Sequence, residues 1–159
     1  MAGNYLYLYL AGVIMSKNRD IFHAIEKHIP YKEFTIITGA RQTGKTTLLR
    51  QVYNKLNKLN QKVWYIAVTL ARKLIPSDLD PENIFQYFIR PETALQNDNH
   101  EKVYLLIDEI QYAQNPSNFL KYLYDTYSPN LKIIATGSSS FYIDKKFTDS
   151  LAGRKKIFT

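Results

Sequence analysis

The chain has 159 residues, a formal net charge of +7 at pH 7, a hydrophobic content of 45% and no cysteine. This length corresponds to about one domain, and the lack of cysteine excludes disulfides and thiol catalysis. No stretch reaches the ~20 apolar residues that a membrane-spanning helix needs, so we expect a cytoplasmic protein with no membrane partner. The positive charge fits either a solvated basic surface or contact with nucleic acid, and both interpretations stay open.

Residues 1–18 are interpreted as an N-terminal extension of the domain. An uncharged run rich in tyrosine and leucine begins at Tyr5 and ends at Met15. It is too short to cross a membrane and has no basic leader of the kind that begins a signal peptide. An edge strand, a partner-docking segment and a non-native addition all fit this run, and we assign it no function.

Residues 19–159 alternate between strand-like and helix-like patterns. Helices, indicated by apolar residues at helical spacing, are expected over 20–29, 46–59 and 116–127, within 82–95, and over 139–150. Strands, indicated by short apolar or β-branched runs, are expected over 33–38, 62–69, 103–107, 131–135 and 155–159. The apolar run at 103–107 is typical of a central strand covered on both faces. This alternation predicts an α/β fold with a parallel sheet and right-handed crossovers.

The strongest local signal lies between the first predicted strand and the helix at 46–59. Residues 39–46 read Gly-Ala-Arg-Gln-Thr-Gly-Lys-Thr, which is the phosphate-binding pattern Gly-x-x-x-x-Gly-Lys-[Ser/Thr] in its expected context. Glycines let the backbone amides at the start of a helix converge on phosphates. Lys45 is placed to reach the β- and γ-phosphates, and the Thr46 hydroxyl to ligate Mg²⁺. We therefore expect ATP and Mg²⁺ as ligands, with nucleotide contacts from Gly39, Ala40, Arg41, Gln42, Thr43, Gly44, Lys45, Thr46 and Thr47.

Two acidic residues follow the apolar run at 103–107. Asp108 stands at the carboxyl end of that predicted strand, where a carboxylate can orient Mg²⁺, usually through its water shell. The next residue, Glu109, can polarise a water for in-line attack on the γ-phosphate. We expect Thr46 and Asp108 to hold the metal and Glu109 to be catalytic. The chain lacks the guanine-reading pattern Asn-Lys-x-Asp, and this favours ATP over GTP.

Further candidate catalytic residues follow the strand predicted at 131–135. Thr136 or Ser138 can touch the γ-phosphate or position the attacking water, although a serine-rich helix cap would explain the same residues. Arg154 precedes the last predicted strand, at a point from which arginines of oligomeric ATPases reach a neighbouring subunit's site. A solvated arginine is the alternative there. Arg41 is a candidate for contact with phosphate or with the region of Glu109. The expected catalytic set is Lys45, Glu109, Thr136 and Arg154.

Four segments together, 39–46, 108–111, 136–139 and 151–154, resemble the prokaryotic AAA+-type ATPases described as ATP-binding proteins of the AAA family. The resemblance extends over about residues 19–159. It implies a P-loop NTPase core with sheet order 5-1-4-3-2, followed in the full protein by a helical lid and a domain resembling restriction-endonuclease folds. The chain departs from this pattern by ending before the lid and by lacking an acidic residue within 67–70. We therefore expect it to be part of a longer protein.

The expected function is Mg²⁺-dependent binding and hydrolysis of ATP, coupled to the missing C-terminal part and weak in this piece alone. A second hypothesis is a switch in which ATP occupancy controls assembly or partner docking while hydrolysis is slow or absent. A third is a nucleic-acid-associated regulator, suggested by the basic charge. A homo-oligomer is expected if Arg154 acts on a neighbouring subunit.

Overall fold

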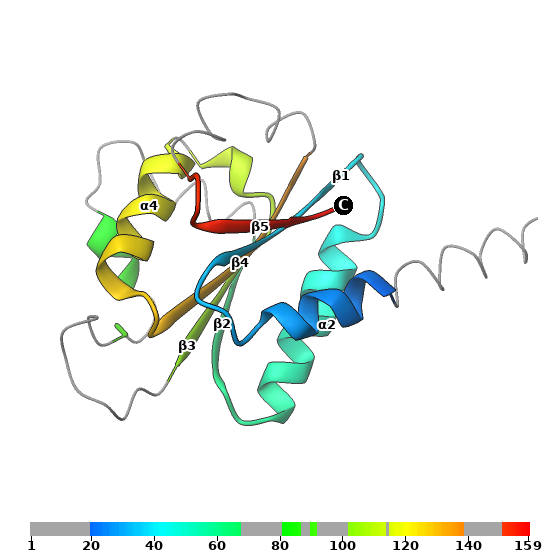
Figure 1. Ribbon diagram of the computed structural model, residues 1–159, viewed down its shortest axis with the longest axis horizontal. Coiled ribbons are helices and arrows are strands. Elements are labelled where there is room, and N and C mark those ends of the chain that lie inside the picture. Colours follow the sequence, from blue (N-terminus) through cyan, green and yellow to red (C-terminus); the bar gives the residue numbers. More distant parts are fainter. Residues whose placement is uncertain (1–19, 68–80, 87–89, 92–101, 114, 139–150) are drawn as a thin grey trace, which may run out of the picture.

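The protein is described from a computed structural model, which covers residues 20–67, 81–86, 90–91, 102–113, 115–138 and 151–159 (Figure 1). Its strands are β1 (Phe34–Gly39), β2 (Lys62–Ile66), β3 (Val103–Ile107), β4 (Leu131–Ser138) and β5 (Lys155–Phe158). Its helices are a segment over 20–28, α2 (Lys45–Lys58) and α4 (Pro116–Tyr127), with short 3₁₀ turns η1 (Pro81–Gln86) and η2 (Ile110–Tyr112). The extension at 1–18, the helix expected at 139–150 and most of the segment between 68 and 101 lie outside these residues.

The five described strands form one parallel sheet in the order β2-β3-β4-β1-β5. Read from the other edge, this is the predicted order 5-1-4-3-2, so that prediction is confirmed. In the central pairing, Ile37 of β1 lies opposite Thr136 of β4, and in the next pairing Ile107 of β3 lies opposite Ala135. The carboxyl ends of β1, β3 and β4 therefore meet at one edge of the sheet, where polar residues follow each strand.

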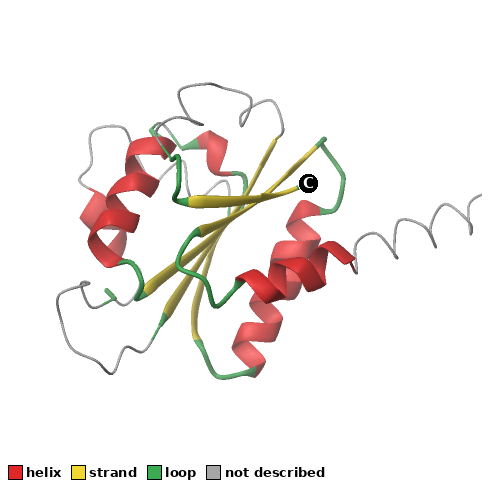
Figure 2. Cartoon of the chain, viewed as in Figure 1, coloured by secondary structure: helices red, strands yellow, loops and turns green. Residues whose placement is uncertain are grey.

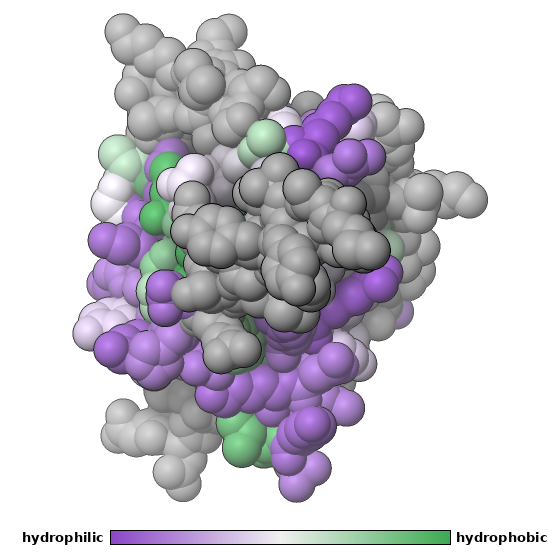
Figure 3. Space-filling model, turned by 90° about the vertical axis from the view of Figure 1, so that its right-hand side faces the viewer, coloured by the Kyte–Doolittle hydropathy of each residue, from purple (hydrophilic) through white to green (hydrophobic). Residues whose placement is uncertain are grey.

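Helices cover both faces of the sheet, as Figure 2 shows. The helix at 20–28 and α2 pack on one face, where Ile37, Leu106 and Ile134 belong to the core. The other face packs against α4 through alternate strand residues such as Ile36 and Leu105. This alternation follows from the two-residue period of a strand. Figure 3 views the side that carries the helix at 20–28 and α2, and hydrophilic residues form most of the described surface there.

Strand β4 is longer than the sequence predicts. It continues to Ser138 instead of ending at Ala135, because its backbone stays paired with β1 as far as the partners Gly39 and Ser138. Threonine, glycine and serine have no strong common preference for strands, so the pairing with β1 maintains the extended backbone here. The consequence is that Thr136 is held inside the sheet, fully buried, and not on a loose connection.

A buried lysine joins the sheet to the turn that follows the helix at 20–28. Lys132 of β4 is fully buried, and its ammonium donates to the backbone carbonyls of His28 at 3.0 Å, Tyr31 at 3.1 Å and Glu33 at 2.5 Å. Burial, followed by the positive charge of Lys102, lowers the pKa of Lys132 to about 7. These three hydrogen bonds connect the sheet to the end of one of its covering helices.

Among the described residues, no helix combines the length and the apolar character required to span a bilayer.

Candidate functional site

The loop at 39–46 connects the end of β1 to the start of α2 and has a tightly curled backbone. Gly44 caps α2 with φ 85° and ψ 13°, and Gly39 has φ 154°. These values lie in regions that side chains disfavour. A Cβ atom at Gly39 would also come within 3.1 Å of the Thr43 hydroxyl, which itself donates to the Ala40 carbonyl at 2.8 Å. The two glycines are therefore required for this curl, which directs the free amides at the start of α2 toward one concave site.

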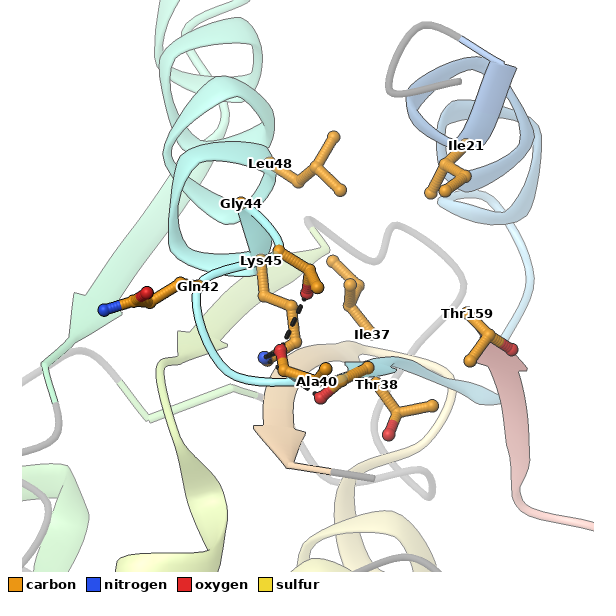
Figure 4. Close-up of a pocket in the computed structure, with 11 residues that line it drawn as sticks. Ile21, Ile37, Thr38, Ala40, Gln42, Gly44, Lys45, Leu48 and Thr159 are labelled. Carbon is orange, nitrogen blue, oxygen red and sulfur yellow. Dashed lines mark hydrogen bonds between the residues drawn. The ribbon is translucent and has the colours of Figure 1, made fainter. Parts of the chain in front are cut away.

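Lys45 lies within this concavity, as Figure 4 shows. Its side chain is only 5% exposed. The ammonium donates to the Ala40 carbonyl at 2.6 Å and to the Gly39 carbonyl at 3.1 Å. A cation at the amino end of a helix is unfavourable for that helix, and Lys45 stands there with no acidic residue in the first turn of α2. The location makes sense if the positive charge faces an anion in the loop.

Two cavities adjoin the loop. The larger has a volume of about 600 Å³ and an apolar wall formed by Ile21, Ile37 and Leu48, with Thr159 at its rim (Figure 4). The smaller has a volume of about 280 Å³ and is lined by Thr46, Thr47 and Glu109 together with loop residues. Both contain the segment 42–45 in their walls. A ligand with an apolar ring system at one end and a charged chain at the other would fit this pair of cavities.

Asp108 follows β3 and accepts hydrogen bonds from three hydroxyl groups. Thr136 donates at 2.6 Å and Thr46 at 3.2 Å to Oδ1, and Tyr65 donates at 3.0 Å to Oδ2. Asp108 is 5% exposed, and hydrogen bonds to a buried carboxylate offset the cost of removing it from water. Burial and the neighbouring Asp108 charge raise the pKa of Tyr65 to about 12, so this hydroxyl stays protonated and remains a donor.

Glu109 has an unusual backbone conformation. Its φ of 55° and ψ of 53° lie in the left-handed region, which is strained for a residue with a side chain. A hydrogen bond from its amide to the Thr136 hydroxyl, at 2.8 Å, maintains this conformation. The carboxylate accepts a hydrogen bond from the Gln111 side-chain amide, and Glu109 lines the smaller cavity together with Lys45. Strained residues of this kind concentrate at functional sites.

The structure brings most of the predicted site residues together, but it separates Arg154 from them. Arg154 directly precedes β5, whose first residue pairs with Phe34 at the amino end of β1, whereas the loop follows the carboxyl end of β1. Its guanidinium donates to both carboxylate oxygens of Asp125 on α4, at 2.8 and 3.3 Å. Any role of Arg154 in catalysis would therefore concern a neighbouring molecule. Arg41 is exposed in the loop, and Ser138 ends β4.

Sequence reasoning missed two residues of the site, Tyr65 and Gln111. Tyr65 lies on β2 opposite Leu106 of β3, the strand that Asp108 directly follows. The predicted sheet order already made β2 the neighbour of β3, so a polar residue near the end of β2 could have been assigned to the site. Gln111 belongs to the segment 108–111 that carries the family resemblance, but no pattern in the sequence predicts its hydrogen bond to the Glu109 carboxylate.

The oxygen atoms of Thr46 and Asp108 are suited to Mg²⁺ bound together with phosphates. Mg²⁺ prefers oxygen ligands, keeps several waters, and often takes only one or two protein groups when it accompanies a nucleotide. The described residues contain no cluster of three or more histidine, cysteine or acidic residues that would hold a metal alone. The donor set therefore fits a metal that arrives with a phosphate ligand.

The fold and the loop geometry define a P-loop nucleotide-binding domain. The AAA domain family matches residues 31–159. The chain belongs to this family of AAA-type ATPases, as the resemblance in the sequence implied.

Two uncharacterized proteins of Methanocaldococcus jannaschii are related in sequence. MJ1637 is 38% identical over 111 residues, which are 69% of this chain and 22% of that protein. MJ1544 is 30% identical over 142 residues, which are 89% of this chain and 29% of that protein. The chain thus spans less than a third of the length of either relative.

Solved structures share the fold at low sequence identity. The structure of Drosophila ORC bound to DNA matches with a TM-score of 0.58 and 13% identity, over 92% of this chain and 91% of that chain. AMPPCP-bound DnaA from Aquifex aeolicus matches with a TM-score of 0.50 and 18% identity, over 99% of this chain and 47% of that chain. At these identities the likeness establishes the fold.

Proposed function

We propose that this domain binds Mg·ATP and hydrolyses it. The observation that carries the proposal is the 3.2 Å hydrogen bond between Thr46, the last residue of the loop pattern, and Asp108 at the end of β3. It joins a phosphate-binding element and a metal-orienting carboxylate from distant parts of the sequence at one sheet edge. Ligands of open parallel α/β sheets bind at such carboxyl ends.

The described residues supply the interactions that a bound triphosphate needs. The amides at the start of α2 and the Lys45 ammonium face its negative charge. The apolar wall at Ile21, Ile37 and Leu48 suits the adenine ring, since ligand sites are mainly apolar with a few convergent polar groups. Thr46 and Asp108 would hold Mg²⁺. When bound, this ion neutralises phosphate charge and thereby favours transfer.

The hydrolytic step falls to Glu109, which lines the same cavity as Lys45. A water oxygen attacks the γ-phosphorus, the bond from that phosphorus to the β–γ bridging oxygen breaks, and Glu109 accepts the proton of the water. Thr136 keeps the backbone of Glu109 in place through the amide hydrogen bond. Arg154 would contribute transition-state charge only from an adjacent subunit, and this makes a homo-oligomer part of the proposal.

A nucleotide-dependent switch with slow hydrolysis is the second candidate. It is favoured by the hydrogen bond that Gln111 donates to the Glu109 carboxylate, because a carboxylate occupied in this way is a weaker base toward water. ATP occupancy would then control assembly, partner docking or an association with nucleic acid. Sedimentation with and without ATP tests this candidate, and a sedimentation coefficient that does not respond to ATP contradicts assembly control.

Replacement of Glu109 by glutamine tests hydrolysis directly. We expect Glu109→Gln to retain ATP affinity within about threefold and to lower phosphate release by about 10²–10⁴-fold, the usual contribution of a general base. Calorimetric titration measures the affinity, and single-turnover phosphate release measures the step. Gln111→Ala is the matched comparison, since it leaves the carboxylate in place. Equal rates for Glu109→Gln and the wild type would exclude Glu109 as the base, while a faster rate for Gln111→Ala would favour the switch.

Tyr65 is proposed to position Asp108 toward the metal. Tyr65→Phe removes one donor from a buried carboxylate and costs about 1–3 kcal/mol locally, so we expect Mg²⁺-dependent ATP affinity to fall about 5–150-fold. ATP affinity without Mg²⁺ should stay unchanged, and this separates positioning from general damage. Tyr53→Phe is the control, because Tyr53 packs edge-to-face on Tyr65 outside the Asp108 network. A loss of equal size with and without Mg²⁺ would argue against the positioning role.

A further inference from the structure

A groove lies between the helix at 20–28 and the edge strand β5, apart from the two cavities at the loop. Its volume is about 530 Å³, and its walls include Lys27, His28, Tyr31, Lys155, Lys156 and Phe158. Lys27 and His28 come from the helix, Tyr31 from the turn after it, and the last three from β5. None of these residues belongs to the nucleotide site, and the proposed ATP chemistry does not use them.

The groove carries a positive charge. Three lysines line it against a single carboxylate, Glu33. His28 lines the groove, and its pKa responds both to burial and to nearby charges. This pKa is lowered to about 4, first by burial and then by the positive charges of Lys132 and Lys156, while Glu33 opposes the shift. The groove therefore favours an anionic ligand, and a bound anion would make protonation of His28 easier.

Aromatic rings form the second feature of the groove. Tyr31 is 61% exposed, although it is a large hydrophobic residue. One face of its ring stacks on His28, with centroids 5.4 Å apart and an interplanar angle of 11°. The His28 ring in turn packs against the ring of Phe158, with centroids 5.6 Å apart. The tyrosine ring is thus held in a fixed orientation from one side and exposed to solvent, and such rings serve as stacking platforms for unpaired bases.

We propose that this groove binds single-stranded nucleic acid, with backbone phosphates at Lys27 and Lys156 and one unpaired base stacked on Tyr31. Proteins that bind single strands combine a basic groove with aromatic rings in this way. A duplex would use the lysines but would leave Tyr31 without a role, because its bases are already stacked. A mononucleotide would reach only part of the charge, because the lysines stand on two separate elements. The proposal is independent of ATP hydrolysis.

The test is fluorescence anisotropy of a labelled oligothymidylate of about 12 nucleotides, titrated with the wild-type chain at several salt concentrations. We expect the double variant Lys27→Ala/Lys156→Ala to bind at least about tenfold more weakly. The slope of the logarithm of the binding constant against the logarithm of salt concentration should become shallower by about 1.4, because each of the two lost phosphate contacts contributes ~0.7. Tyr31→Ala should weaken binding about 5–100-fold with the slope unchanged. The matched control is Lys58→Ala/Lys121→Ala, which removes two exposed lysines on α2 and α4 and should bind as the wild type does.

A second measurement does not depend on any variant. The imidazole resonances of His28, followed by NMR against pH, should give a pKa that rises when the oligonucleotide is added. Equal weakening by both double variants, or an unchanged His28 pKa at saturation, would overturn the proposal. The proposal would also be overturned if another ligand bound more tightly than the oligothymidylate at the same total concentration of negative charge. The ligands compared are a duplex of the same length, an acidic peptide, and AMP with inorganic phosphate. Thermal melting of each variant checks that a loss of binding is not a loss of fold.

Discussion

The Lys45→Ala variant is expected to bind ATP at least about 100-fold more weakly than the wild type, which corresponds to about 3 kcal/mol. Lys45 is 5% exposed and stands at the amino end of α2 within the curled loop. A charge held in so confined a place interacts with a polyphosphate at low effective dielectric, where charge-assisted hydrogen bonds are strong. Calorimetric titration with ATP and with ADP measures the effect, and ADP should lose less because it lacks the γ-phosphate.

The control for this variant is Lys58→Ala, in the last turn of the same helix. Lys58 is exposed, so the change removes the same charge from α2 without touching the loop. Its ATP affinity should match the wild type within about twofold. Thermal melting adds a second readout, since a ligand that binds the native state raises its stability in proportion to RT ln(1 + [L]/Kd). If ATP still shifted the melting temperature of Lys45→Ala by the wild-type amount, the loop would not be the phosphate site.

The sequence determines much of the fold because its periodic patterns are clear. The apolar run of β3 and the helix of α4 have the boundaries that the sequence predicts, Val103–Ile107 and Pro116–Tyr127. The sheet order was available only through the family resemblance, and the structure confirms it. Periodicity alone predicts strands and helices but not which strands are neighbours. The order of the strands depends on the path of the crossover connections, and no local sequence pattern specifies that path.

The candidate site could be predicted only in part. The loop and the pair Asp108–Glu109 stand in short motifs, so their residue types identify them. The interactions that arrange these groups are tertiary. The three hydroxyls at Asp108 come from the loop, from β2 and from β4, and no motif predicts that they meet. The left-handed conformation of Glu109 is likewise enforced by Thr136 from another strand.

The Lys132→Met variant is expected to lose at least about 3 kcal/mol of unfolding free energy. Methionine keeps the apolar stem but cannot donate a hydrogen bond. The carbonyls of His28, Tyr31 and Glu33, which accept hydrogen bonds from Lys132 in the wild type, would each lose this bond, at a cost of about 1 kcal/mol or more. Lys102→Met is the matched control, because Lys102 donates to a single carbonyl of the same turn, that of Pro30, at 2.9 Å. It should lose about 1 kcal/mol. Urea unfolding followed by circular dichroism measures both.

The pH dependence of stability distinguishes the role of Lys132 from a simple packing defect. Its pKa is about 7 in the folded protein against an ordinary value of 10.5, so between these pH values the unfolded chain binds more protons than the folded one. Stability should therefore rise as pH increases from 7 toward 10.5 and become independent of this group below pH 7. Lys132→Met should lack this rise, whereas Lys102→Met should keep most of it. Two results together would contradict this role: parallel pH profiles of stability for Lys132→Met and the wild type, and equal stability of the two methionine variants. The hydrogen bonds from Lys132 to the three carbonyls would then not be what stabilises the turn after the helix at 20–28.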